Sequence, residues 1–187
     1  MWGKKVTEEK IKRAIKNAKD GLEKYKNIMK LFSKVNVSES KEFQSIYTGF
    51  YRVRHNNPDF YNDYYSFMEE HRNNIPSFKD TLTYLYKFGR LESSFASKLL
   101  ATIDPELPVW DQFILRHFGL EQPSTDMIKE ARIIQANNVY EEIKQKYKEF
   151  LKTNESRCWI KLFDEYYPET NLTSIKKIDL ILWQMRA

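Results

Sequence analysis

Residues 89–120 read GRLESSFASKLLATIDPELPVWDQFILRHFGL, and this stretch carries the strongest structural signal in the chain. Small and apolar side chains at helical spacing predict a buried helix over 92–103. Two prolines in residues 104–108 predict a rigid loop. A second helix is expected over 111–118, ended by Gly119, because glycine tolerates the left-handed conformation common at helix C-termini. The stretch is therefore expected to form two helices joined by a rigid loop.

The rest of the chain follows the same pattern. It has 187 residues, near the usual size of one domain, and only 5 Gly and 6 Pro, which suits long helices and short loops. Apolar periodicity and capping residues, with Thr7 as the first N-cap, predict these further helices: 7–34, 38 or 40 to 55, 59–71, 77–88, 124–152 with a possible break at 137–138, 155–166 and 174–186. We therefore expect one all-α domain of eight to ten helices over residues 1–187.

Composition narrows the classes of function. The single cysteine, Cys158, cannot form an internal disulfide and is interpreted as a small packing residue on a helix, in a reducing compartment. No apolar run is long enough to span a membrane, and the charged N-terminus does not read as a signal peptide, so a cytoplasmic protein is expected. The sequence shows no glycine-rich phosphate loop, no zinc spacing among its histidines and no nucleophile elbow. We expect no cofactor and no metal cluster.

Positive charge is concentrated at the N-terminus. Residues 1–34 hold 11 Lys/Arg and 4 Asp/Glu, a net charge of +7, whereas the remainder has a net charge of −2. If residues 1–35 contain one long amphipathic helix packed on the rest, a row of lysines falls within a sector of about 80° beside its apolar stripe. Such a row is either a solvated helix face or a surface that follows a nucleic-acid backbone. Its candidates for backbone contacts are Lys12, Lys16, Lys19, Lys26 and Lys30.

The pattern in residues 89–120 resembles the helix-hairpin-helix DNA glycosylase superfamily. In that family a buried helix and a loop precede an aspartate that begins the next helix, in a pattern like Val-Asp-x-x-Val-x-Arg. The matching segment is Val109-Trp110-Asp111-Gln112-Phe113-Ile114-Leu115-Arg116. By this resemblance, Asp111 takes the position of the catalytic aspartate. Lys98 is the nearest candidate for the lysine of the bifunctional members, but it is not in register with it without a gap, so hydrolysis is expected rather than a Schiff-base lyase step.

The chemistry of base excision suggests roles for further residues. Cleavage of the bond between base and sugar builds positive charge on the sugar, which a nearby carboxylate stabilises while it orients the attacking water. A flipped base is held between flat side chains, and phosphates are held by basic ones. The candidate substrate contacts are Trp110, Tyr51, Arg52, Arg54, Gln112, Arg116 and Trp183.

Each candidate also has a purely structural interpretation. Asp111 can act as an N-cap, since aspartate is favoured there. Lys98 can lie on the surface beside a buried helix. The two tryptophans can belong to the core, and the two arginines at 52 and 54 can stabilise the carboxyl end of a helix.

Three hypotheses follow. The first is a monofunctional DNA glycosylase-like hydrolase with Asp111 as its carboxylate. The second is a helical nucleic-acid-binding module without catalysis, which is favoured because the hairpin at residues 89–94 has one glycine where the family's hairpin is usually glycine-rich. The third is a helical protein-interaction module with an exposed apolar patch. DNA is the expected partner under the first two, and the oligomeric state is left open.

Overall fold

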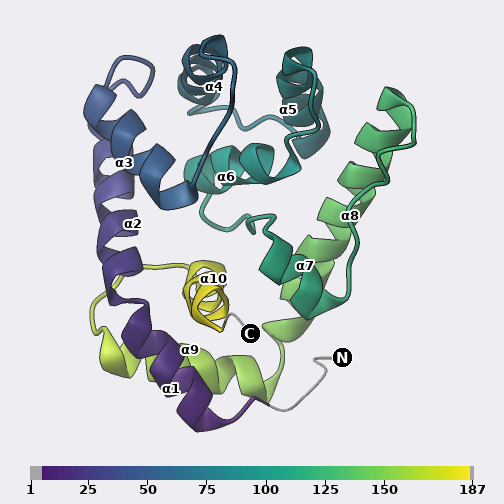
Figure 1. Ribbon diagram of the computed structural model, residues 1–187. Helices are drawn as coiled ribbons and strands as arrows, with labels where there is room; N and C mark the ends of the chain where they lie inside the picture. The colour runs from purple at the N-terminus through teal and green to yellow at the C-terminus, as the bar shows by residue number, and fades with distance from the viewer. Residues whose placement is uncertain (1–5, 186–187) are drawn as a thin grey trace.

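The computed structural model describes residues 6–185, and within them every regular element is a helix, which confirms the all-α class (Figure 1). Ten α-helices and one short 3-10 helix cover this range. They are α1 (Glu8–Asn17), α2 (Lys19–Phe32), α3 (Lys41–Tyr51), α4 (Asp59–Glu70), α5 (Phe78–Leu85), η1 (Tyr86–Phe88), α6 (Ser93–Ile103), α7 (Gln112–Phe118), α8 (Lys129–Phe150), α9 (Asn154–Tyr166) and α10 (Ser174–Gln184).

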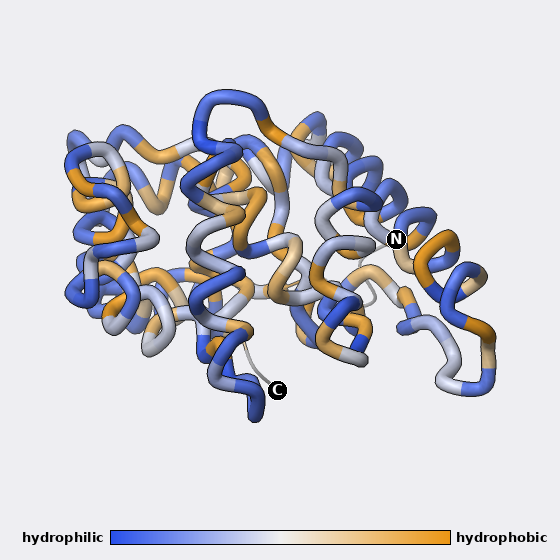
Figure 2. The backbone as a smooth tube through the Cα atoms, turned by 90° about the horizontal axis from the view of Figure 1, so that it is seen from above, coloured by the Kyte–Doolittle hydropathy of each residue, from blue (hydrophilic) through white to orange (hydrophobic). Residues whose placement is uncertain are grey.

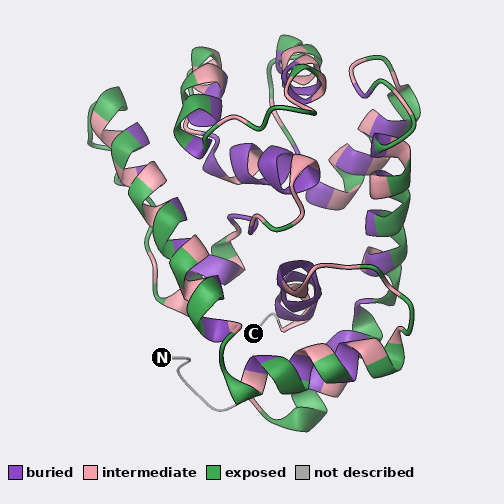
Figure 3. Ribbon diagram, turned by 180° about the vertical axis from the view of Figure 1, so that it is seen from behind, coloured by how far each residue is buried: buried purple, intermediate pink, exposed green. Residues whose placement is uncertain are grey.

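Helix α10 occupies the centre of the molecule. Helices α1, α7 and α9 pack against it, while α2 packs on α3, and α5 packs on both α6 and α8. Figure 1 shows α10 end-on with the other helices around it, and Figure 3 shows that α6 and α10 are buried over most of their length. The buried apolar residues form one cluster, and the last part of the loop between α6 and α7, residues 108–110, is buried with it.

The local sequence explains why the helices begin where they do. Several start after a Ser or Thr whose side-chain oxygen accepts a hydrogen bond from the backbone two or three residues on, as an N-cap does. These caps are Thr7, Ser40, Ser77, Thr153 and Thr173. Figure 2 shows hydrophilic and hydrophobic residues alternating along most helices, as helices with one buried face require. None of the helices within residues 6–185 combines the length and apolar character needed to cross a lipid bilayer.

The prediction of one long helix over residues 7–34 is wrong. The helix is interrupted at Ala18, whose N–H bonds the Ile15 carbonyl three residues back at 3.0 Å, and the chain changes direction there (Figure 1). Helix α1 packs on α9 and α10, whereas α2 packs on α3. The apolar periodicity of residues 7–34 does not indicate this bend, because α1 and α2 each bury an apolar face and the periodicity continues from one helix into the other.

Helix α3 ends earlier than predicted. Its C-cap is Arg52, in the left-handed conformation with φ 53°, and the Arg52 N–H bonds the Thr48 carbonyl. Arg54 and His55 therefore lie in the following segment and not in the last helical turn. The proline at position 58 allowed a longer helix, but the hydrogen bonds that end α3 are made six residues before it.

Two further expectations are corrected. Helix α8 begins at Lys129 rather than 124 and runs unbroken through Asn137 and Asn138, because one face of it is buried along its length. Cys158 is exposed on α9 and is not a packing residue. The prediction of a helical residue at this position is confirmed.

Candidate active site

Asp111 sits where the interior loop meets α7. Its backbone is extended, and its Oδ1 accepts a hydrogen bond of 2.8 Å from the Phe113 N–H, so it is the N-cap of α7. Gly119 ends the same helix in the left-handed conformation, with φ 67°. The carboxylate is half-buried. The predicted cap is confirmed, and Oδ2 is the oxygen that capping leaves available for other chemistry.

Lys98 is buried, so its interpretation as a surface lysine is wrong. It is 6% exposed, and its Nζ donates a hydrogen bond of 2.9 Å to the Tyr51 carbonyl at the carboxyl end of α3. Within residues 6–185 this carbonyl is the one hydrogen-bond acceptor of the ammonium group, which can donate three. The ring of Phe95 lies 5.5 Å from Nζ. A buried ammonium with one neutral acceptor is costly, and such groups gather at functional sites.

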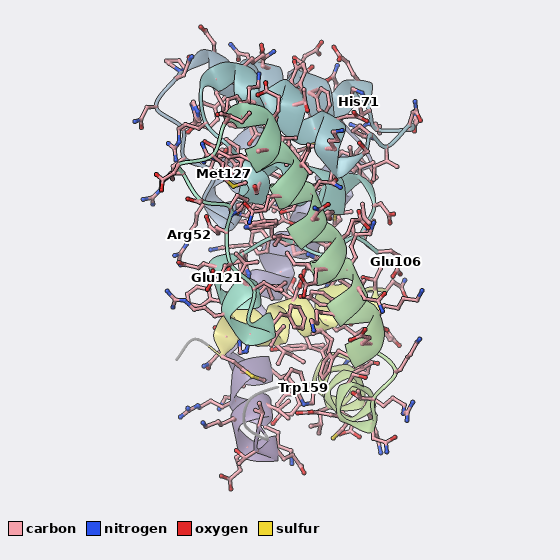
Figure 4. All side chains as sticks on the ribbon, turned by 90° about the vertical axis from the view of Figure 1, so that its right-hand side faces the viewer. Arg52, His71, Glu106, Glu121, Met127 and Trp159 are labelled. Carbon is pink, nitrogen blue, oxygen red and sulfur yellow. The ribbon has the colours of Figure 1, made fainter. Side chains whose placement is uncertain are left out.

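The charge of Asp111 acts on Lys98, which lies 13 positions earlier in the sequence. Burial lowers the pKa of Lys98 to about 8, while the carboxylates of Asp111 and Glu92 oppose this shift and the guanidinium of Arg52 adds to it. Arg52 itself is exposed, at the edge of the molecule in Figure 4. The structure thus places the Lys98 ammonium on the Tyr51 carbonyl, and the charges of Asp111 and Arg52 act on it.

Glu92 belongs to the same cluster and was not predicted as a site residue. It directly precedes α6 and is buried, which raises the pKa of its carboxyl, while Arg90, His55 and Lys98 act in the opposite direction. The sequence contained one signal, since an acid stands in the hairpin where the resembling family has small residues. Its carboxylate lies against the segment between α3 and α4, where His55 Nε2 is 3.7 Å from its Oε1, and the sequence does not specify this packing.

A second buried charged group lies on α10 and was also missed. Asp179 accepts hydrogen bonds from the hydroxyl of Tyr147 and from Lys176 Nζ, the latter at 3.3 Å. Burial raises the pKa of Asp179. The Asp111 carboxylate adds to this shift, whereas Lys176 and the Tyr147 hydroxyl oppose it. No motif in the sequence indicated this group, because Lys176 and Asp179 lie on α10 and Tyr147 on α8, and the apolar periodicity of a helix does not show which polar side chains meet between two helices.

The aromatic candidates occupy different environments. Trp110 is buried, its backbone N–H donates a hydrogen bond of 2.8 Å to the Ser97 hydroxyl, and its ring stacks on that of Phe78 with 6.1 Å between the centroids, so it offers no face to a ligand. Trp183 is half-buried, with its ring 5.5 Å from that of Phe50 and 6.4 Å from that of Tyr51.

Trp183 and Tyr51 border a recess. The remaining lining residues are Phe50, Val109, Lys176, Asp179 and Leu180. The volume open to water in this recess is about 10 Å³, roughly that of a single water site. Its lining includes three aromatic rings and the charged Lys176 and Asp179, but in this conformation a nucleobase does not fit.

The other predicted contacts are not part of this cluster. Gln112 and Arg116 are exposed on α7, with the Arg116 guanidinium 5.8 Å from the Phe113 ring, and Arg54 is exposed after α3. The candidate lysines of the N-terminal region are exposed, except for Lys12, which is half-buried and pairs with Glu8 at 2.6 Å. They are Lys12, Lys16, Lys19, Lys26 and Lys30, and they are divided between α1 and α2.

No protein-family model, curated protein or solved structure matches this chain. The features that bear on function are therefore the all-helical architecture and the cluster formed by the buried Lys98 and Glu92 with the half-buried Asp111.

Proposed function

We propose that this chain is a DNA glycosylase-like enzyme of the helix-hairpin-helix type, which hydrolyses the N-glycosidic bond of a flipped, modified base with Asp111 as its carboxylate. The observation that carries the proposal is the position of Asp111 as the half-buried N-cap of α7, one loop after the buried Lys98, whose positive charge the Asp111 carboxylate favours. The hairpin from α5 through η1 to α6, turned by the left-handed Gly89, supports it as well.

The chemistry follows from these groups. As the base leaves, the sugar becomes positively charged, and a carboxylate at Asp111 stabilises that charge and orients a water molecule for attack. Below the pKa of about 8, Lys98 remains mainly an ammonium group and is a poor nucleophile, which favours hydrolysis over amine attack. The closed recess requires that the last turn of α10, which carries Trp183, moves when a base enters.

The proposal is tested by measuring base release from duplex oligonucleotides that each contain one modified base. Asp111→Asn retains a capping side chain, since asparagine caps helices as well as aspartate does, but it removes the charge. We expect base release to fall by about 100-fold or more, as for loss of a principal electrostatic contact to the transition state, with an unchanged melting temperature. Full activity in Asp111→Asn, or no release from any substrate, would overturn the proposal.

Borohydride trapping separates the two mechanisms. Hydrolysis leaves no covalent complex, whereas attack by the Lys98 amine gives a Schiff base that borohydride fixes to the protein. We expect no trapped complex. A complex that disappears in Lys98→Met would replace hydrolysis with a lyase mechanism at the same site.

A second candidate is a helical binding module without catalysis. It is favoured by two observations: the Asp111 carboxylate already caps α7, and the recess beside Trp183 is closed. If it binds DNA, affinity should fall steeply with salt and respond to Lys16 and Lys30 but not to Asp111. A protein partner would instead use the apolar residues exposed around the start of α8, where Ile128 is 72% exposed and Met127 lies near it (Figure 4).

A further inference from the structure

Lys176 and Asp179 are two buried charged residues that line the recess beside Trp183. They stand three positions apart on α10, are 3% and 5% exposed, and form an ion pair of 3.3 Å between Lys176 Nζ and Asp179 Oδ2. The Tyr147 hydroxyl donates a hydrogen bond to the other oxygen of the same carboxylate from α8. The ion pair and this hydrogen bond fix both charged groups beside the recess.

The pair retains hydrogen-bonding capacity that the protein does not use. An ammonium group can donate three hydrogen bonds, and a carboxylate can accept about four. In the part of the chain that the structure describes, Lys176 Nζ donates one, to Asp179, and the Asp179 carboxylate accepts two. The ring of Tyr25 on α2 lies 4.9 Å from Nζ. A ligand in the recess can therefore meet a donor from Lys176 beside an acceptor on Asp179.

Stability alone does not explain a buried ion pair at this position. Replacing such a pair by apolar side chains of similar size is often neutral or stabilising. The rings of Phe50, Tyr51 and Trp183 line the same recess. Apolar and aromatic side chains with a few convergent polar groups are the usual lining of a ligand site, and flat rings hold a flat ligand.

Trp183 is the part of the lining that can move at the lowest cost. It lies in the last turn of α10, one residue before the helix ends at Gln184, and helix ends open locally at a small cost in free energy. Tyr51 and Val109, in contrast, are buried in the core. Displacement of Trp183 would enlarge the recess while the ion pair stays in place.

We propose that this recess binds a neutral base and that Lys176 and Asp179 recognise its edge, with Lys176 donating to an acceptor on the base and Asp179 accepting from the neighbouring N–H. The two charges cancel, so the pair does not favour a positively charged, alkylated base. Lys176 and Asp179 are then specificity-determining residues and take no part in cleavage. The inference rests on the proposed function for the identity of the ligand as a nucleobase.

Binding is measured by NMR on the full chain, with nucleosides as probes. Inosine and uridine present an N–H beside a carbonyl oxygen, whereas 1-methylinosine and 3-methyluridine lack that N–H. The indole N–H signal of Trp183 is assigned by its loss in Trp183→Phe. We expect inosine or uridine to shift this signal and the methylated counterpart to bind about tenfold or more weakly, because it leaves a buried acceptor unpaired. At pH 6, where 7-methylguanosine is a cation, it should bind no more tightly than inosine.

A double variant and a matched control test the ion pair. Lys176→Met combined with Asp179→Asn removes both charges and leaves neither unpaired, and asparagine retains an acceptor for Tyr147. In this variant we expect the unmethylated nucleoside to bind as weakly as its methylated counterpart. Lys177→Met is the control, because Lys177 is the next residue on α10, pairs with Asp164 at 2.6 Å and does not line the recess. It should retain the affinities of the natural protein. Where the double variant fails to fold, Asp179→Asn alone replaces it.

Three results would overturn the inference: no shift of the Trp183 signal with inosine or uridine, equal binding of the methylated nucleosides, or unchanged discrimination in the double variant. Tighter binding of 7-methylguanosine than of inosine would also contradict it. None of these readouts needs base release. A protein that binds and discriminates nucleosides but releases no base therefore refutes the proposed function alone. Base release with the same substrate preference in the double variant refutes only the role of Lys176 and Asp179.

Discussion

At the scale of single residues, Lys98 is the most unusual side chain in the described structure. Burial removes an ammonium group from water, and one backbone carbonyl replaces only part of its hydration. The bond to Tyr51 does stabilise the carboxyl end of α3, where a cation is favoured. Replacing a buried charge by a well-packed apolar side chain is nevertheless often neutral or stabilising. If Lys98 serves only the structure, an apolar replacement should lower the free energy of unfolding. If it serves chemistry, the same replacement should leave the free energy of unfolding unchanged or raise it.

Lys98→Met distinguishes these cases through pH. Since the pKa of Lys98 is about 8 in the folded protein and about 10.4 in an unfolded chain, the unfolded state binds more protons between these values. The stability of the natural protein should therefore rise with pH in that window, by up to about 1.4 kcal/mol per pH unit from this residue, and should not change through this residue below pH 8, where both states carry the proton.

Urea unfolding at pH 7, 8.5 and 9.5 measures this effect. We expect Lys98→Met to be at least as stable as the natural protein at pH 7, with its advantage shrinking toward pH 9.5. Both proteins share the buried tyrosines, whose pKa values are raised by burial and which titrate above this range. A variant that is less stable by the same amount at every pH would identify Lys98 as a structural cap of α3.

At the scale of the helix, the end of α3 controls the geometry of the cluster. The chain turns at Arg52 with φ 53°, a conformation that side chains other than glycine adopt at a cost. That turn exposes the Arg52 side chain and leaves the preceding carbonyl, that of Tyr51, directed at Lys98. Backbone strain of this kind is common at functional sites.

Substitutions at Arg52 measure the strain. Arg52→Gly and Arg52→Ala both remove the guanidinium, but only glycine relaxes the backbone. We expect the glycine variant to be more stable than the alanine variant by about 1 kcal/mol in chemical denaturation. Equal stabilities would show that the left-handed turn is not strained. In both variants the pKa of Lys98 should rise, because a nearby positive charge is removed.

The helices show how far the sequence determines the structure. Periodicity and caps predicted the positions of most helices, including the N-cap at Asp111 and the left-handed Gly119, because these depend on residues close in sequence. The bend at Ala18 and the early end of α3 depend on which helix each segment packs against. The burial of Lys98 and Glu92 depends on the same long-range packing, so the sequence revealed the candidate aspartate but not the cluster around it.

At the scale of the whole molecule, the two leading functions use different surfaces. In the cluster of Lys98, Asp111 and Glu92 only Asp111 is half-buried rather than buried, whereas the exposed lysines lie along α1 and α2. Because α1 and α2 bend at Ala18, their lysines do not form the single straight row that a continuous helix would give. A duplex that follows one of these helices would leave the other, which weakens the case for a binding surface made of all of them.

Hydrogen exchange with and without a DNA duplex shows which surface is used. If the protein binds a flipped base, protection should increase around residues 52–54 and 104–112, while exchange should change in the last turn of α10 as Trp183 moves. Protection confined to α1 and α2 would favour the binding module. Asp111→Asn is the matched control, because it keeps the cap of α7 and leaves every surface lysine in place. Under the catalytic proposal the variant should give the same footprint while releasing base about 100-fold more slowly or less, since the carboxylate acts on the transition state more than on binding. A duplex that changes exchange nowhere would exclude nucleic acid and leave the apolar residues at the start of α8 as the surface to test.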